Sequence, residues 1–193
     1  MVLDRDFQFN KEKFRDVVHW ICERFEDTPD KLGRTKLHKL LYFSDMFHYL
    51  DTGSPLTGVD YLKQPYGPTA RHLGATLVDL VDSGTVDIVR RNYFGYNKYD
   101  FHVKSFLRSN LISEKEKFLL SEVCDFAGEK SAKEISDISH KDPWDSVAMG
   151  EVIPYDTAPL LLPRRAPTEQ DVSWANNAVS KIIQGETHGP WAN

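Results

Sequence analysis

Apolar residues recur at helical spacing along most of the chain, and this pattern predicts a mainly helical fold. Residues 10–26 carry one apolar stripe behind Asn10, a residue type favoured at helix N-caps. Residues 34–51 are apolar over so much of the helix circumference that we expect a central, buried helix. The same reasoning predicts further helices over 69–82, 113–126, 131–139, 142–150 and 168–184.

Capping residues mark the starts of three of these helices. Two pairs have the spacing of a capping box, Ser113 with Glu116 and Ser131 with Glu134. Asp142 followed by Pro143 is typical of an N-cap and a first helical residue. The stretch 151–167 holds four prolines, so we expect an extended strap there.

Two short stretches alternate with period two and predict one small β ribbon. They are 86–89 and 99–103, and Arg90–Lys98 would form the hairpin loop between them. A helix followed by a two-stranded ribbon resembles the end of a winged-helix unit. The expected fold is therefore a mainly helical α+β class: one compact domain of about seven helices with one small β ribbon, partly winged-helix-like.

Composition narrows the functional classes. The 193 residues are 40% hydrophobic and 27% charged, which excludes a mostly disordered or collagenous protein. The net charge of −5 argues against a dedicated nucleic-acid binder, because such proteins are usually basic. We find no signal-peptide pattern and no apolar stretch of membrane length, so we expect a soluble cytoplasmic protein without membrane contact.

The cysteines and the helix 34–51 are the first candidates for chemistry. Cys22 and Cys124 fall in helical apolar patterns, and we expect buried free thiols rather than metal ligands. His38 and Asp45 share a polar strip with Arg34, and His48 follows Asp45 by three residues. Such residues could form an acid–base site or half of a metal site, or could satisfy one another or solvent around a core helix. No third ligand supports a metal, so we favour the structural interpretation.

Two other segments resemble catalytic or phosphate-binding motifs only superficially. Ser139, His140 and Asp142 have the residue types of a hydrolytic triad, but no nucleophile elbow accompanies them. We expect an inter-helix turn there, anchored by Trp144. Tyr66-Gly67-Pro68 lacks the glycine and lysine spacing of a phosphate-binding loop. We therefore predict no catalytic, cofactor-binding or metal-binding residues and no enzyme activity.

The ribbon region 86–108 combines basic and aromatic residues. Five cations oppose two carboxylates there, a local charge of +3, and four aromatic residues interleave with them: Tyr93, Phe94, Tyr96 and Tyr99. Such a surface can contact nucleic acid. It can equally engage an acidic protein surface. A third alternative is a solvated wing whose aromatic residues pack on the body of the domain.

Several motifs, taken in order, resemble those of one known family, the SocA-like, phage-associated Panacea domain. The first is the helix Thr35-Lys36-Leu37-His38-Lys39-Leu40-Leu41-Tyr42-Phe43-Ser44-Asp45. It is followed by Tyr66-Gly67-Pro68, Ser83-Gly84-Thr85-Val86, Ile135-Ser136-Asp137-Ile138-Ser139-His140, Pro143-Trp144 and Gly150 with Ile153-Pro154-Tyr155. The resemblance spans about residues 10–157. It implies a Panacea-like domain over 1–157, with 158–193 as a C-terminal strap, helix and tail packed on that domain.

The resemblance implies an antitoxin of a type II-like toxin–antitoxin pair. Its partner would be a protein toxin encoded by an adjacent gene and neutralised by direct contact. Delivery of the toxin to a protease is a second implied route. A winged-helix-like regulator that binds the DNA of its own operon stays an alternative. Candidate partner-binding residues come from the motifs and the ribbon tip: Lys36, Tyr42, Asp45, Tyr66, Arg91, Tyr93, Phe94, Tyr96, His140 and Trp144.

Overall fold

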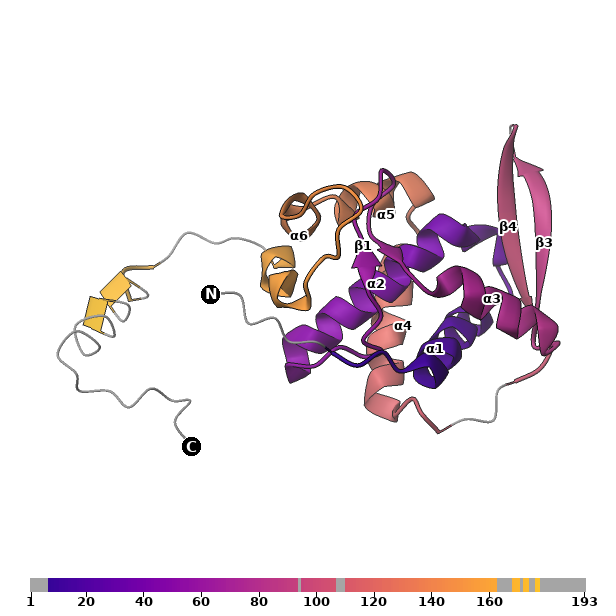
Figure 1. Ribbon diagram of the computed structural model, residues 1–193, viewed down its shortest axis with the longest axis horizontal. Helices are drawn as coiled ribbons and strands as arrows, with labels where there is room; N and C mark the ends of the chain where they lie inside the picture. Colours follow the sequence, from indigo (N-terminus) through magenta and orange to yellow (C-terminus); the bar gives the residue numbers. More distant parts are fainter. Residues whose placement is uncertain are drawn as a thin grey trace. The chain divides into compact units, whose positions relative to one another are not determined.

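A computed structural model describes residues 7–93, 95–106 and 110–162, together with 168–170, 172–173 and 176–177 (Figure 1). The chain divides into two compact units, Met1–Leu161 and Leu162–Asn193. All of the sites described below belong to the first unit. Within the described ranges, none of the helices combines the length and the hydropathy that a membrane span needs.

The first two helices confirm those expected from the apolar pattern. α1 spans Lys11–Arg24, and its Asn10 cap accepts a 3.0 Å hydrogen bond from the Lys13 backbone N–H. The 3₁₀ helix η1 (Pro29–Lys31) lies between α1 and α2. α2 spans Gly33–Thr52 and ends at Gly53, whose φ of +75° lies in the left-handed region that glycine adopts without strain.

The β structure is more extensive than the sequence pattern predicted. β1 (Tyr61–Leu62) pairs antiparallel with β2 (Thr69–Ala70), and α3 begins only afterwards, over Leu73–Asp82. The expected helix start at residue 69 is therefore wrong, because Thr69 and Ala70 pair with a strand instead. β3 (Val86–Tyr93) pairs with β4 (Tyr96–Val103) along eight residues of each strand. The expected loop Arg90–Lys98 is accordingly part of the ribbon, down to the Tyr93–Tyr96 pair.

The later helices follow the predicted caps, with one exception. α4 (Glu114–Gly128) and α5 (Ala132–Ser139) both begin at complete capping boxes. α6 (Asp142–Asp145) has only four residues, and Lys141 rather than Asp142 is its N-cap. The 3₁₀ helix η2 (Tyr155–Leu161) occupies part of the segment that we expected to be extended. In the second unit, residues 169–170, 172–173 and 176–177 are helical. The rest of the predicted helix 168–184 lies outside the described residues, and its packing stays a prediction.

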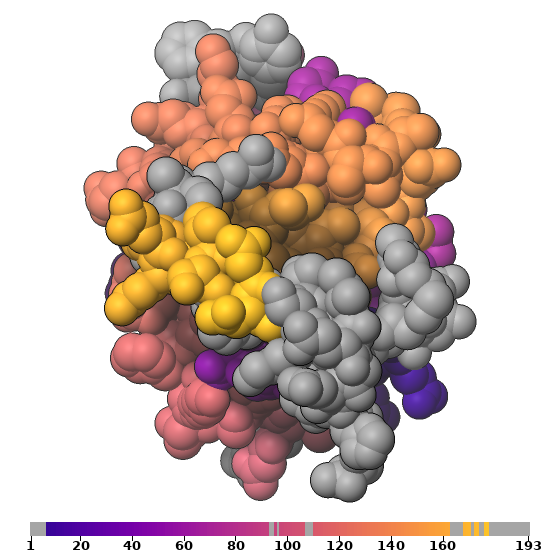
Figure 2. All heavy atoms as spheres, turned by 90° about the vertical axis from the view of Figure 1, so that its left-hand side faces the viewer, coloured from indigo at the N-terminus to yellow at the C-terminus, as the bar shows by residue number. Residues whose placement is uncertain are grey.

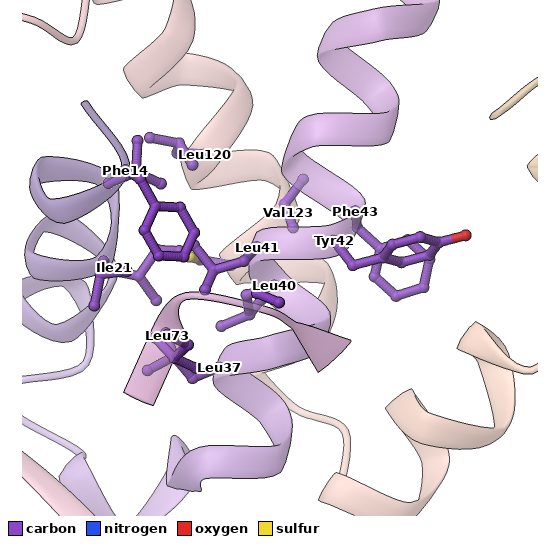
Figure 3. Packing of buried hydrophobic residues seen from close by; sticks show 14 of the residues in the cluster. Phe14, Ile21, Leu37, Leu40, Leu41, Tyr42, Phe43, Leu73, Leu120 and Val123 are labelled. Carbon is purple, nitrogen blue, oxygen red and sulfur yellow. The ribbon is translucent and has the colours of Figure 1, made fainter. Parts of the chain in front are cut away.

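α2 is the central element of the first unit. It packs against α1, α4, α5, β2, β4 and η2. Figure 3 shows side chains from α1, α2, α3 and α4 meeting in one core, among them Phe14, Ile21, Leu40, Leu73 and Leu120. Each of these side chains is fully buried, and each stabilises the fold by about 1.5–3 kcal/mol relative to an exposed position.

Cys22 and Cys124 belong to the same core as buried free thiols, which confirms the prediction for both. Burial raises the pKa of each thiol to about 12. From residue 7 to residue 162, the described chain has six α-helices, two 3₁₀ helices and two small antiparallel sheets. This architecture confirms the mainly helical α+β class.

Candidate functional site

Asp45 fastens the middle of α2 to the segment that follows the helix. Its carboxylate accepts hydrogen bonds of 2.7 Å from the Thr57 N–H, the Thr57 hydroxyl and the Tyr61 hydroxyl. Burial raises the pKa of this carboxyl group, whereas the three donors act in the opposite direction. The side chain is 1% exposed, so its oxygens serve this connection rather than solvent.

The Tyr66-Gly67-Pro68 turn is held between α2 and α5. The Lys39 ammonium group donates to the Pro68 carbonyl at 2.9 Å, and the Ser136 hydroxyl donates to the Tyr66 carbonyl at 2.8 Å. Gly67 has a φ of +89°, and a Cβ there would lie 2.6 Å from Ser139 Oγ. Only glycine fits this conformation and this contact without rearrangement.

Trp144 connects α6 to the residues just before the Tyr66-Gly67-Pro68 turn. Its indole N–H donates to the Gln64 carbonyl at 3.2 Å, and the Lys63 ammonium group lies 4.1 Å from the ring centroid. The His140 ring lies 4.4 Å from the Trp144 ring. Segments that are distant in sequence are therefore joined: the turn that follows β1 contacts α5 and α6 (Figure 1). In Figure 2, the orange surface of α5, α6 and the segment after them gathers on one face of the first unit.

The motif residues differ widely in accessibility. Tyr42 is fully buried, and among the described residues its hydroxyl has no hydrogen-bond partner. Lys36 is 3% exposed and donates to the Gly128 carbonyl at 3.4 Å. Tyr66, by contrast, is 78% exposed although its backbone is firmly held. Of these three residues, Tyr66 offers the side chain that a partner can reach directly.

Two residues considered for catalysis, His38 and Ser139, have structural hydrogen-bond partners. His38 Nδ1 accepts from the Ala70 N–H at 3.1 Å, and burial, with Lys39 and Arg34 nearby, lowers the pKa of His38 to about 3. The Ser139 hydroxyl donates to the Ser136 carbonyl rather than to His140. Across the described ranges, no group of three or more His, Cys, Asp or Glu side chains could hold a metal ion.

A concavity lies beside the first turn of α2. This α2 groove, with a volume of about 750 Å³, is bounded by η1, the start of α2, β4 and the α4–α5 connection, with Tyr66 at its rim. Six cationic side chains line it: Lys31, Arg34, Lys36, Lys39, Lys98 and Lys130. Two carboxylates, Asp30 and Glu129, oppose them. The α2 groove therefore carries a formal excess of four positive charges.

The ribbon is less free to bind phosphates than its composition predicted. Arg91 pairs with Asp100 at 2.7 Å, and Lys104 pairs with Asp87 at 2.9 Å. Tyr93 and Tyr96 face each other across the ribbon end in the strand register. Phe94 lies outside the described residues, so the predicted role of the ribbon tip stays a prediction.

The fold and these sites define a helical α+β module with a basic groove and an exposed aromatic residue, Tyr66, beside it. Residues 37–145 match the model of the family described as antitoxin SocA-like, Panacea domain. The match covers more than half of the chain, and the chain belongs to this family. No significant match was found among curated proteins or among solved structures.

The matched range is shorter than the resemblance over residues 10–157, but it contains most of the motifs on which that resemblance was based. It includes Tyr42, Asp45, Tyr66, His140 and Trp144, and it begins one residue after Lys36. Sequence reasoning missed the α2 groove, because its cations come from four separate segments. The two lysines of the Thr35–Asp45 motif, Lys36 and Lys39, were the available signal.

Proposed function

We propose that this protein neutralises a cognate protein toxin, encoded by an adjacent gene, through direct protein–protein contact. Membership of the SocA-like antitoxin family carries the proposal. The chemistry of the described residues agrees with it, because His38 and Ser139, two of the residues considered for catalysis, have structural hydrogen bonds. The protein would act by covering the toxin, without catalysing a reaction.

Several of the candidates from the sequence belong to the ribbon end and the turn. Arg91, Tyr93, Phe94, Tyr96 and Tyr66 supply arginine and aromatic side chains, the types that dominate binding energy in protein interfaces. Lys36, Tyr42, Asp45, His140 and Trp144 would contribute by holding the scaffold that presents them. An interface of standard size needs only about 800 Å² from each partner.

A growth assay combined with co-purification tests the proposal. The adjacent gene is expressed alone and together with this protein; growth arrest followed by rescue, with a stable complex, is the expected result. Arrest without rescue, or no arrest, would contradict it. Loss of the toxin from the cell during rescue, instead of a stable complex, would identify protease delivery.

The ribbon end has its own test. Tyr93→Ala combined with Phe94→Ala is expected to weaken toxin binding about tenfold or more, with an unchanged melting temperature. Phe118→Ala is the matched control, because Phe118 is an exposed aromatic residue on α4. Equal toxin affinity for the double variant and the wild type would remove the ribbon end from the interface.

The alternative of a DNA-binding regulator has less support. Lys98 lies 3.8 Å from the Asp100 carboxylate that also pairs with Arg91, so this carboxylate neutralises part of the ribbon charge. Operator binding that falls steeply with salt, in the absence of any toxin interaction, would favour the regulator instead.

A further inference from the structure

The α2 groove is positive on a protein that is negative overall. The whole chain has a net charge of −5, whereas the lining of the α2 groove has a formal excess of four positive charges. Its volume of about 750 Å³ is within the range of about 300–1,000 Å³ that is typical of ligand pockets. A concentrated local charge of this kind attracts an anionic partner, since low-dielectric walls focus the field.

Four of the six lining cations make no ion pair within the described part of the chain. Arg34, Lys36, Lys39 and Lys130 lie without a salt bridge to any carboxylate of the described residues. Lys36 and Lys39 are 3% and 1% exposed, and the hydrogen bond found for each ammonium group goes to a backbone carbonyl, of Gly128 and Pro68 respectively. Each ammonium group has three donors. Arg34, by contrast, is exposed, so an incoming carboxylate can reach its guanidinium group and supply a charge partner.

The backbone adds to the same positive potential. The first turn of α2, from Gly33 to Lys36, lines the groove, and its N-cap residue, Leu32, makes no side-chain capping hydrogen bond. The N-terminus of a helix carries about half a positive charge, which favours carboxylates nearby. Tyr66 stands at the rim on the turn that Lys39 and Ser136 hold. An aromatic surface therefore adjoins the cationic one.

We propose that the α2 groove receives an acidic segment of the toxin, with a carboxylate on the exposed Arg34, in the positive potential of the other lining cations, and an apolar side chain against Tyr66. This assignment rests on the proposed function. A protein segment fits better than nucleic acid, because the acidic surface elsewhere would repel an extended phosphate backbone.

A peptide titration tests the groove without the toxin. The probe is a fluorescein-labelled glutamate-rich peptide with a central leucine, and its control has glutamine in place of every glutamate. Lys31→Glu combined with Arg34→Glu removes the formal charge excess of the groove. This double variant should keep its fold, because acidic residues are favoured beside the first turn of a helix. A thermal melt checks that.

The matched control is Lys115→Glu combined with Lys117→Glu. Both lysines lie near the start of α4, whereas Gly128 at its end lines the groove, about 20 Å away along the helix. The control changes the net charge of the protein by the same amount. We expect the groove variant to bind the acidic peptide about tenfold more weakly, and the control variant to bind it as the wild type does.

Equal affinities of the wild type and the groove variant, or no binding of the acidic peptide by the wild type, would overturn the proposal. Tighter binding of a labelled single-stranded oligonucleotide, lost in the groove variant, would overturn it in favour of nucleic acid. Tyr66→Ala should weaken peptide binding and Tyr66→Phe should restore it, whereas equal binding by all three proteins would remove Tyr66 from the site.

The toxin assay separates this proposal from the proposed function. If the adjacent gene product proves harmless, the proposed function fails, and the assignment of the acidic segment to a toxin fails with it, whatever the peptide shows. If the wild type rescues growth, the groove variant should rescue poorly while the control variant rescues fully. Full rescue by the groove variant would overturn the groove assignment and leave the proposed function intact.

Discussion

The junction of α2, the 57–68 segment, α5 and α6 differs from the α2 groove beside it in how its polar groups are satisfied. In the junction, Asp45, Ser136 and Trp144 all have hydrogen-bond partners on other segments. In the groove, Arg34 and Lys36 face a concavity without carboxylate partners among the described residues. The difference agrees with a scaffold role for Asp45, Ser136 and Trp144 and with the proposal that a partner contacts the groove at Arg34.

Removing the Asp45 carboxylate should have the largest effect on the junction. Asp45→Ala leaves two donors on Thr57 and one on Tyr61 buried without an acceptor. We expect this to lower the free energy of unfolding by about 3–5 kcal/mol. Urea unfolding measures the loss. Asp51→Ala is the control, since Asp51 is exposed and pairs only at the surface with Lys115. An equally small effect of both substitutions would mean that Asp45 does not hold the junction.

Trp144→Ala should cause the second-largest loss of stability. Because Trp144 is half-buried, we expect its removal to lower the free energy of unfolding by about 2–3 kcal/mol. The loss comes from packing, from the hydrogen bond to Gln64 and from the Lys63 contact. Trp144→Phe should recover part of this loss. An unchanged melting temperature of the alanine variant would mean that Trp144 does not stabilise the scaffold and would favour a role in binding.

Alanine variants of two glycines can separate the effect of the close contact in the 63–68 turn from the effect of backbone strain. Gly67 and Gly95 have similar φ angles of +89° and +85°, but a Cβ on Gly95 would meet nothing within 4 Å. Both alanine variants carry the backbone strain, and only Gly67→Ala adds the clash with Ser139 and Lys39. We expect Gly67→Ala to lower the free energy of unfolding by about 1–2 kcal/mol more than Gly95→Ala. Equal losses would show that the turn can shift freely.

The smallest predicted effect is a pH dependence at Lys39. Burial lowers the pKa of Lys39 from its ordinary 10.5 to about 7, so above pH 7 the unfolded chain binds more protons than the folded protein. Stability should therefore rise with pH by at most about 1.4 kcal/mol per unit between pH 7 and about 8.5. Lys39→Met should flatten this slope, whereas Lys133→Met, at an exposed position, should keep it. A persisting slope in Lys39→Met would assign it to another group.

Local signals in the sequence predicted the helices well. Asn10, Ser113 and Ser131 cap the helices that they were expected to start, because a cap depends on residues within one turn. β2 was missed because Thr69 and Ala70 owe their conformation to β1, which lies outside that local window. The ribbon was underestimated because its outer half is polar and exposed, so no alternating apolar pattern marks it.

The candidate site was predictable only in part. The Thr35–Asp45 motif drew attention to Asp45 and Tyr42, but their burial depends on Thr57, Tyr61 and the surrounding core. Sequence spacing alone cannot show such partners. The α2 groove depends on cations from η1, α2, β4 and the end of α4, which only the folded chain brings together.

The two buried thiols can report how often the packing around them opens. Because Cys22 and Cys124 are inaccessible and their pKa values are raised to about 12, a thiol reagent should react with them only when the packing of α1 and α4 opens. The labelling rate therefore measures how often the wild-type chain opens, without any engineered cysteine. Any partner that binds only the closed form will slow that rate in proportion to its occupancy.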